Sequence, residues 1–471
     1  METPALRPRG PTSTTVPLPL GEVLRLAGDA EASGRFEEAR RLLDYILAAE
    51  PNEPSALHLS GVVAFRLGDP EKALAQMERS LELGIDTPLY LRNICEMYRV
   101  LGRLDEALDT ARQAVVLAPS DPLCLQNIAI IHFHRLEIDE AIACADAALR
   151  IDPTLPGAHF ARAEALLLRG DWEQGWEEYE WRFRIQGASP LMPPTNAPQW
   201  DGKPLQSETL LLVADQGFGD VVQFCRYIPW AVERCPDIAI ACSKPMAALV
   251  RQQHPTLKIF QHWQDCPPFA AYCALSGLPR LHGTRTDNVP ALAPYLHADP
   301  KRIAQWRERL DRIAPRGYRR VGLVWAGQPR HNNDRNRSTT LSTFAPLGSL
   351  RGIALVSLQK GPATVQAGQY FGQAPLLNIG AEVADYDDTM AIIDSLDLVI
   401  TVDTSVGHLA GAMNRPSWIM LPRAPDWRWL LERSDSPWYP SVRLFRQSVS
   451  RQWAGPIGEI TAALREQFAA V

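Results

Sequence analysis

The sequence predicts an α-helical repeat array followed by two α/β lobes, each built on a parallel sheet. Two observations support this fold class. Small residues recur every 34 positions over the first third of the chain, and from Leu205 onward short apolar β-type runs alternate with helical stretches. The length of 471 residues is enough for three domains at roughly 150 residues each.

The repeat array is expected over residues 20–186, after an N-terminal stretch, 1–19, that we expect to be disordered. A pair of amphipathic helices cannot bury its apolar face alone, so successive pairs stack. Four series of positions carry the period: two of small residues in the helices, one of turn glycines and one of helix-ending prolines. Leu136 replaces a glycine in the third series, and Ile85 replaces a proline in the fourth. In that order, the series are Ala39, Ala73, Ala107, Ala141 and Gly175; Ala27, Gly61, Cys95, Ala129 and Ala163; Gly34, Gly68, Gly102 and Gly170; and Pro51, Pro119 and Pro153.

This pattern resembles the tetratricopeptide repeat over about residues 20–184. The resemblance implies a concave groove that takes a peptide or a partner protein. Asn93 and Asn127 occupy equivalent places in successive repeats and could hold a peptide backbone through their amides. Two alternatives stay open: the asparagines are ordinary surface residues, or the array only stabilises the second half.

The last repeat is rich in aromatic residues. Aromatics at spacings of three to five indicate burial, so we expect this helix to dock the array onto the next domain. Residues 187–204 follow as a proline-rich linker or extended crossing segment. The aromatic residues are Trp172, Trp176, Tyr179, Trp181 and Phe183.

The first lobe is expected over residues 205–310. Its first strand, Thr209–Ala214, leads into DQGFGD and then a helix over Val221–Trp230. Gly217 and Gly219 at this strand-to-helix turn would let backbone N–H groups approach an anion. Further strands are expected at Ile238–Ala241 and Leu257–Phe260.

The second lobe, residues 311–471, has five expected strands and is predicted to be Rossmann-like. The fourth strand ends at Asp403, and a helix begins at Thr404 or Ser405. The positive end of that helix favours phosphate, and ligands of such sheets bind beyond the carboxyl ends of the strands. The strands are Arg320–Ala326, Ala354–Leu358, Leu376–Ile379, Leu398–Val402 and Ser417–Leu421.

Several motifs resemble the heptosyltransferase-like glycosyltransferases of the GT-B fold over residues 205–471. These are the Gly-Asp pair in DQGFGDVVQFCRYIP, the DTSVGHLAGA segment, and GLVWAGQPRH, RNRS and DSPWYPSVRLFRQ. Together with the repeats, they are similar to a bacterial class of repeat-bearing, heptosyltransferase-like proteins. The implied architecture is a repeat solenoid followed by a GT-B-like pair of Rossmann-like lobes.

The resemblance implies a role for each matching residue. Asp220 would be the general base that takes the acceptor hydroxyl proton. Asp403 and Thr404, with Ser405 and with His408 one turn on, would hold the diphosphate of a nucleotide sugar. The reaction would be inverting and need neither metal nor cofactor, so cationic side chains would stabilise the leaving diphosphate. Our candidates for these cations are Arg337 and Lys360.

Two departures and several structural alternatives stand beside these roles. RNRSTTLSTFAPL replaces the family's Lys followed by Trp-Pro, and SLQKGPA replaces its ribose-binding segment, so the nucleotide is undetermined. Asp220 and Asp403 could cap helices, and His408 could be a core histidine. Arg337 and Lys360 could be solvated charges. Trp427, Trp429, Trp438 and Tyr439 could stack on a base or a sugar, but we expect them to pack the segment that returns toward the first lobe.

Composition narrows the function classes. A net charge of -6 disfavours nucleic acid as a partner. No apolar run approaches the ~20 residues of a membrane span, and the N-terminus is not of signal-peptide type, so we expect a cytoplasmic protein.

The predicted function is transfer of a sugar from a nucleotide-activated donor to a glycan or to a protein, such as flagellin, recruited by the array. The alternative is a non-catalytic scaffold with a degenerate nucleotide-binding domain.

Overall fold

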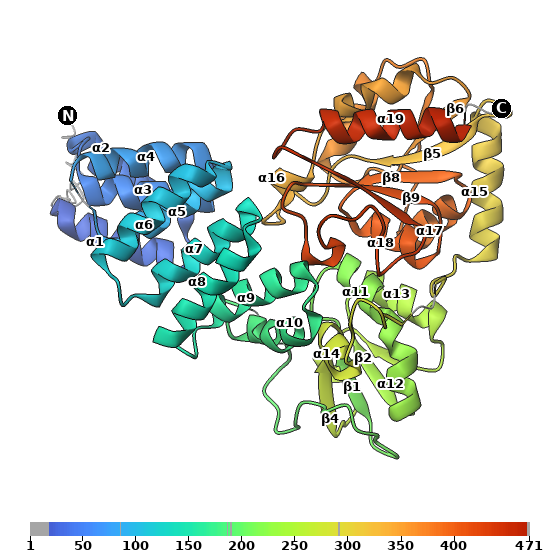
Figure 1. Ribbon diagram of the computed structural model, residues 1–471, viewed down its shortest axis with the longest axis horizontal. Helices are drawn as coiled ribbons and strands as arrows, with labels where there is room; N and C mark the ends of the chain where they lie inside the picture. Colours follow the sequence, from blue (N-terminus) through green and yellow to red (C-terminus); the bar gives the residue numbers. More distant parts are fainter. Residues whose placement is uncertain (1–17, 85, 186, 189–190, 291–292, 469–471) are drawn as a thin grey trace, which may run out of the picture. The chain divides into compact units, whose positions relative to one another are not determined.

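The computed structural model describes residues 18–84, 86–185, 187–188, 191–290 and 293–468. Residues 1–17 of the predicted disordered start, and Ile85, lie outside these ranges. The chain divides into two compact units, residues 1–134 and 135–471, and each is described by itself (Figure 1).

The first unit is an array of antiparallel helix pairs. Ala39, Ala73 and Ala107 are fully buried between the helices. A Cβ atom at Gly61 would lie only 2.7 Å from Cγ of Met77, so this position requires a residue without a side chain. The helices are α1 (Leu20–Ala32), α2 (Phe36–Ala49), α3 (Pro54–Arg66), α4 (Pro70–Glu82), α5 (Pro88–Leu101), α6 (Leu104–Leu117) and α7 (Pro122–Arg135).

The second unit begins with the same helical pattern, which confirms the predicted tetratricopeptide-like array. The turn glycine Gly170 has a φ of 100°, and Leu136 takes the same left-handed conformation with a φ of 64°. The turn geometry is therefore kept where the glycine is missing. The elements are α8 (Ile138–Ile151), α9 (Pro156–Arg169), α10 (Trp172–Tyr179) and the 3-10 helix η1 (Glu180–Arg184).

The first α/β lobe has a four-stranded parallel sheet in the order β3-β2-β1-β4. The sequence missed β4. The helix expected over Val221–Trp230 starts earlier, at Phe218, and is broken into three pieces. The elements are β1 (Leu210–Val213), α11 (Phe218–Phe224), η2 (Cys225–Tyr227), α12 (Ile228–Arg234), β2 (Ile238–Ala241), α13 (Lys244–Gln253), β3 (Lys258–Phe260), η3 (Trp263–Asp265), β4 (Ala271–Ala274), η4 (Leu275–Gly277) and α14 (Leu278–His282).

The second α/β lobe has a six-stranded parallel sheet in the order β10-β9-β8-β5-β6-β7. Counted within the lobe, this is the 3-2-1-4-5-6 order of doubly wound sheets. A sixth strand, β10, adds to the five predicted. The elements are α15 (Pro300–Ile313), β5 (Arg319–Val324), α16 (Asp334–Arg337), η5 (Leu341–Ser349), β6 (Ile353–Ser357), η6 (Pro362–Gln369), β7 (Leu376–Asn378), α17 (Tyr386–Asp394), β8 (Leu398–Val402), α18 (Ser405–Ala412), β9 (Ser417–Leu421), η7 (Trp427–Trp429), β10 (Val442–Arg446) and α19 (Ala454–Phe468).

Two segments differ from the expected domain limits. The predicted boundary at 310/311 falls inside α15, which packs on α17 of the second lobe; Arg309 pairs with Glu382 at 2.8 Å there. Within the expected linker 187–204, Trp200 is buried. Its backbone N–H donates a hydrogen bond to the carbonyl of Tyr272, in β4, at 2.8 Å. In the described parts of the chain, no helix combines the length and apolarity that a membrane crossing needs.

Candidate functional site

The residues predicted to form an anion site lie at the carboxyl edge of the second sheet. Strand β8 ends at Val402, Asp403 follows, and Thr404 precedes the first turn of α18. The Thr404 hydroxyl bonds the Thr401 hydroxyl at 2.9 Å, and no side chain caps this helix. The first backbone N–H groups of α18 therefore have no side-chain cap, and the helix presents its positive end there.

Asp403 is a buried carboxyl in a charged neighbourhood. It is only 8% exposed. Burial raises the pKa of Asp403 to about 6, with a contribution from the negative charge of Asp426, while Arg337 and Arg428 oppose the shift. Two aspartates and two arginines thus influence one another at the end of β8.

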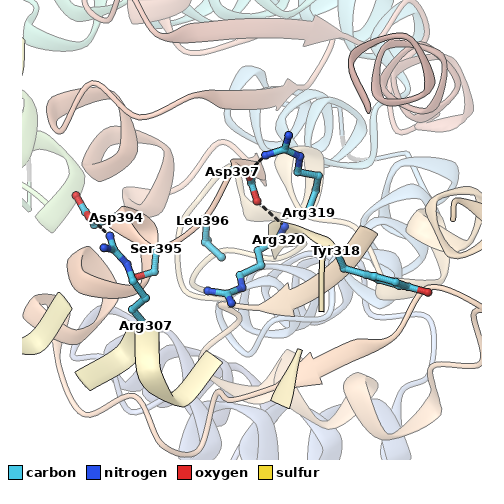
Figure 2. A pocket seen from close by; sticks show the side chains of 9 residues that line it. Arg307, Tyr318, Arg319, Arg320, Asp394, Ser395, Leu396 and Asp397 are labelled. Carbon is cyan, nitrogen blue, oxygen red and sulfur yellow. Dashed lines mark hydrogen bonds and ion pairs between the residues drawn. The ribbon is translucent and has the colours of Figure 1, made fainter. Parts of the chain in front are cut away.

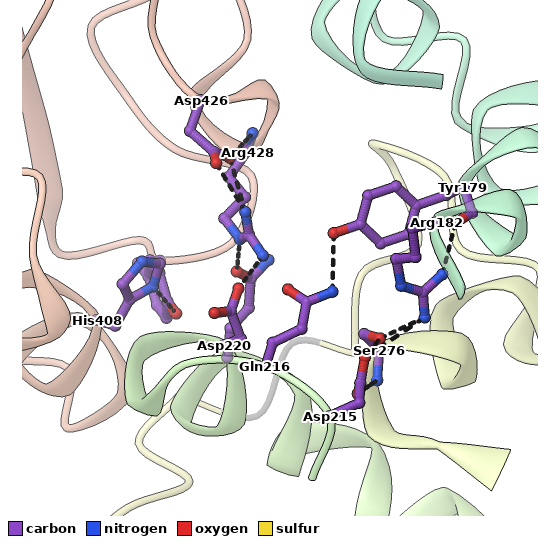
Figure 3. Close-up of polar contacts among 11 residues, drawn as sticks. Tyr179, Arg182, Asp215, Gln216, Asp220, Ser276, His408, Asp426 and Arg428 are labelled. Carbon is purple, nitrogen blue, oxygen red and sulfur yellow. Dashed lines mark hydrogen bonds and ion pairs between the residues drawn. The ribbon is translucent and has the colours of Figure 1, made fainter. Parts of the chain in front are cut away.

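Asp220 in the first lobe lies beside this cluster. It belongs to the first turn of α11, and its Oδ1 accepts a hydrogen bond from Nη2 of Arg428, which lies in η7 of the second lobe (Figure 3). The Asp220 side chain is 24% exposed and that of Arg428 is 7% exposed. Burial raises the pKa of Asp220, and Arg428 partly offsets the rise. The structure brings the predicted base to the interface of the two lobes.

Arg428 is the centre of the cluster, and sequence reasoning missed it. Its Nη1 donates to both carboxylate oxygens of Asp426, at 2.8 and 2.9 Å, and its Nε donates to Gln223. The guanidinium carbon lies 4.3 Å from the centre of the Trp427 ring. One available signal was an arginine inside the aromatic run DWRW, because a buried charge needs a partner.

One of the two predicted glycines, Gly219, allows α11 to pack closely on its neighbour. A Cβ at Gly219 would lie 3.0 Å from Cδ2 of His408 and 3.6 Å from Cα of Ser405. Gly219 therefore allows α11 to pack directly on α18. Gly217 precedes α11 in an extended conformation with a φ of -65°. These contacts place Ser405 and the head of α11 side by side.

His408 has the environment of a core histidine. It is 7% exposed, and its Nδ1 is 2.9 Å from the Tyr439 hydroxyl. Burial, assisted by Arg428, lowers the pKa of His408 to about 3. The neutral imidazole therefore joins α18 to the segment before β10.

The two predicted cations have different surroundings. Arg337, at the end of α16, is 15% exposed, its Nε is 3.4 Å from Oδ1 of Asp334, and its charge acts on Asp403. The Lys360 ammonium instead donates to the carbonyls of Gly380 at 2.9 Å and Val383 at 2.7 Å. Lys360 thus holds the loop after β7.

The last repeat helix docks on the α/β region, as the aromatic pattern predicted. Trp172 stacks on Trp438 with ring centres 4.9 Å apart, and Trp176 meets Trp427 at 5.2 Å. The tryptophan and tyrosine side chains of the returning segment are at most 2% exposed, so they pack in the interior, as expected: Trp427, Trp429, Trp438 and Tyr439.

The asparagines considered for peptide binding are engaged inside the first unit. Nδ2 of Asn93 lies 3.0 Å from Nε2 of His58. Nδ2 of Asn127 lies 3.5 Å from the Arg92 carbonyl and 3.4 Å from Sγ of Cys95. These contacts favour a structural role for both side chains. Among the described residues, no group of three or more histidine, cysteine or acidic side chains comes together as a metal site.

Two pockets lie away from this cluster. One, of about 360 Å³, is at the amino ends of β5 and β8, where Arg319 pairs with Asp397 at 3.0 Å and Arg307 with Asp394 at 3.5 Å (Figure 2). The other, of about 560 Å³, is lined by Arg169 and by residues of the 430–435 segment. Each lining includes a charged pair: Arg319 with Asp397 in the first pocket and Arg433 with Asp435 in the second.

Comparisons with known proteins identify the repeats. Tetratricopeptide-repeat profiles match residues 24–88, 61–122 and 156–175. Protein FlbA of Caulobacter vibrioides is 27% identical over 469 residues, which cover 93% of this chain and 71% of FlbA. That likeness therefore extends through both the repeats and the α/β lobes.

Solved structures of repeat proteins are also similar to part of this chain. A thermophilic TPR protein of Thermus thermophilus is 22% identical, with a TM-score of 0.32, over 36% of this chain and 92% of its own. YrrB, described as a TPR protein with an unusual peptide-binding site, is 18% identical, with a TM-score of 0.30, over 35% of this chain and 84% of its own.

Proposed function

We propose that this protein is a glycosyltransferase that moves a sugar from a nucleotide-activated donor to an acceptor hydroxyl. One observation carries the proposal: a partly exposed carboxylate, Asp220, lies beside an uncapped helix N-terminus on the facing lobe. Their juxtaposition follows from the packing of α11 on α18 through Gly219. A base and an anion site on opposite lobes are what an inverting transfer requires.

The chemistry divides between the two lobes. Arg428 binds Oδ1 of Asp220 and orients the carboxylate, so that Oδ2 receives the proton of the acceptor hydroxyl. The acceptor oxygen attacks the anomeric carbon from the face opposite the diphosphate, and the bond from that carbon to the diphosphate oxygen breaks. The backbone N–H groups of Ser405 and its neighbours, with the Thr404 hydroxyl, would receive the leaving diphosphate.

Cationic side chains offset the charge of the diphosphate in this scheme. Arg337 acts on the same carboxyl, Asp403, that starts the anion site. The Lys360 ammonium is held by two carbonyls, so it is not used here. Arg428 adds its charge to this neighbourhood, but its Nε, Nη1 and Nη2 already donate to Gln223, Asp426 and Asp220. Arg337 is therefore the cation proposed to bind the phosphate oxygens, which a guanidinium can bind in pairs.

The array would recruit the acceptor, either a protein or a glycan. Tetratricopeptide repeats are present, and such arrays offer extended concave surfaces for partners. The nucleotide sugar is a substrate in this scheme, and no metal or cofactor is invoked. We place the reaction in the cytoplasm, where activated sugars are made.

A donor panel tests the proposal. Full-length protein is screened by thermal shift against ADP-, UDP-, GDP- and CMP-linked sugars, because a ligand that binds only the folded state raises the apparent Tm. Donors that bind are then tested for release of the nucleoside diphosphate with and without acceptor. We expect one base to stabilise the protein and to support turnover. Failure of every donor to bind or react would contradict the proposal.

A non-catalytic scaffold is the second candidate. The ion pair between Asp220 and Arg428, together with the buried aromatics around it, favours it, because a carboxylate tied to a guanidinium is a weaker base. This candidate predicts partner binding by the array with no turnover of any donor. The same panel therefore separates the two functions.

A further inference from the structure

The end of the repeat array contacts the segment that carries Asp220. Residues Asp215–Asp220 run from the turn after β1 into the first turn of α11. Gln216 donates through Nε2 to the Tyr179 hydroxyl at 2.9 Å. Arg182, in η1, donates through Nη2 to Oγ of Ser276 at 2.5 Å, and the same nitrogen is 3.6 Å from Oδ2 of Asp215.

These polar contacts are partly buried, and those of Arg182, Ser276 and Asp215 form one network. The Arg182 side chain is 9% exposed and that of Asp215 is 3% exposed. Ser276 donates two hydrogen bonds to the Asp215 carboxylate, one from its backbone N–H at 3.2 Å and one from its hydroxyl at 2.5 Å. Asp215 follows β1 and Ser276 follows β4, so this network lies at the carboxyl edge of the first sheet. Figure 3 shows the contacts among its three residues.

Tyr179 also contacts Trp427, the residue that precedes Arg428, and Arg428 is the partner of Asp220. Its ring centre is 5.9 Å from that of Trp427, and Trp427 carries the Arg428 guanidinium on its face. One side of Tyr179 therefore contacts the residues before Asp220, and the other side contacts the residue before Arg428. A displacement of this tyrosine would act on both members of the ion pair.

We propose that Tyr179 and Arg182, at the end of the repeat array, are positioning residues for the Asp215–Asp220 segment. The array then acts on the site through direct hydrogen bonds. This inference deepens the proposed function and rests on it for its catalytic meaning. The contacts themselves predict a measurable effect on backbone protection in the absence of any substrate.

Hydrogen–deuterium exchange of the full chain tests the inference. Tyr179→Phe keeps the ring and removes the hydroxyl that Gln216 contacts. Arg182→Lys keeps the charge and removes the guanidinium whose Nη2 contacts both Ser276 and Asp215. We expect each variant to speed exchange of amides in residues 215–220 by about 3- to 10-fold, the equivalent of one net hydrogen bond. Peptides of α9 should be unchanged.

A matched control is Tyr98→Phe. This hydroxyl donates to Oε1 of Glu78 at 2.6 Å in the first unit, so its loss should leave residues 215–220 unaffected. Unchanged exchange at 215–220 in both test variants would overturn the inference. Equal loss of protection across α9 and α10 would also overturn it, because a merely structural role loosens the whole junction.

Kinetics separate this inference from the proposed function. With a donor that turns over, Tyr179→Phe should lower kcat while leaving the KM for the donor unchanged, and Tyr98→Phe should alter neither. An unchanged kcat in Tyr179→Phe would overturn the positioning role. If the unmodified protein turns over no donor, the proposed function fails, and the exchange result still decides whether these side chains position the segment.

Discussion

The ion pair between the lobes can be tested by replacing Arg428 with methionine. Methionine fills much of the same volume and can still lie on Trp427, but it leaves the carboxylates of Asp220 and Asp426 without their shared cation. Removing one partner of a fully buried pair costs about 3–5 kcal/mol. The Asp220 and Asp426 side chains are 24% and 37% exposed, so water offsets part of this. We expect a loss of about 2–3 kcal/mol at pH 7.5.

The sign of the pH dependence follows from the freed carboxyls. Burial already raises the pKa of Asp220, and loss of Arg428 raises it further. A group whose pKa is higher in the folded state favours folding most at low pH, and this contribution is lost as the pH rises through the folded pKa. The deficit of Arg428→Met should therefore be small near pH 4.5 and largest at pH 7.5.

Urea unfolding at both pH values provides the assay, with fluorescence of the buried tryptophans as the probe. Arg443→Met is the matched control, because Arg443 is an exposed arginine whose guanidinium lies 4.8 Å from the Phe445 ring centre. It should change stability by less than about 0.5 kcal/mol. A deficit in Arg428→Met that is equal at both pH values, or no larger than the control, would refute the reasoning.

Two further predictions concern the packing and charge of the same region. Gly219→Ala places a Cβ 3.0 Å from Cδ2 of His408, and it should lower the free energy of urea unfolding by about 1–3 kcal/mol. The control is Gly458→Ala, which adds a Cβ in open space on α19 and should not destabilise the protein. Equal effects of the two substitutions would contradict the close packing of α11 on α18. Asp403 has a pKa raised to about 6, so its contribution is present below about pH 4 and is lost as the pH rises through about 6. Asp403→Asn should consequently gain stability over the unmodified protein at pH 7.5 and differ little at pH 4, and a difference independent of pH would count against the burial of this carboxyl.

The repeat array could be predicted because its packing depends on spacing along the chain. Ala73 and Gly61 each belong to a series of small residues with a period of 34, and these small residues are the ones that lie buried between helices. The strands of the second lobe were also predictable, since parallel strands buried on both faces are continuous apolar runs. Strand β10 was missed because Arg443 and Arg446 interrupt its apolar residues, so that it is not a continuous apolar run.

The site was only partly predictable. Asp403 could be found because it directly follows a strand end, and Asp220 because it belongs to the Gly-Asp pair on which the family resemblance rests. The partner of Asp220 could not, because Arg428 is 208 positions away and the pairing depends on how the two lobes meet. Lys360 has the right charge, but the sequence does not indicate that the carbonyls of Gly380 and Val383 bind its ammonium.

The most direct test of the central claim is the rate of Asp220→Asn with a donor that the protein turns over. Removing a general base costs about 10²- to 10⁴-fold in rate, so we expect kcat to fall at least about 100-fold while donor binding persists. Asp435→Asn is the matched control, since Asp435 is also paired with an arginine, Arg433, at 2.7 Å but is 71% exposed. Equal rates for Asp220→Asn and Asp435→Asn would contradict the assignment of Asp220 as the base.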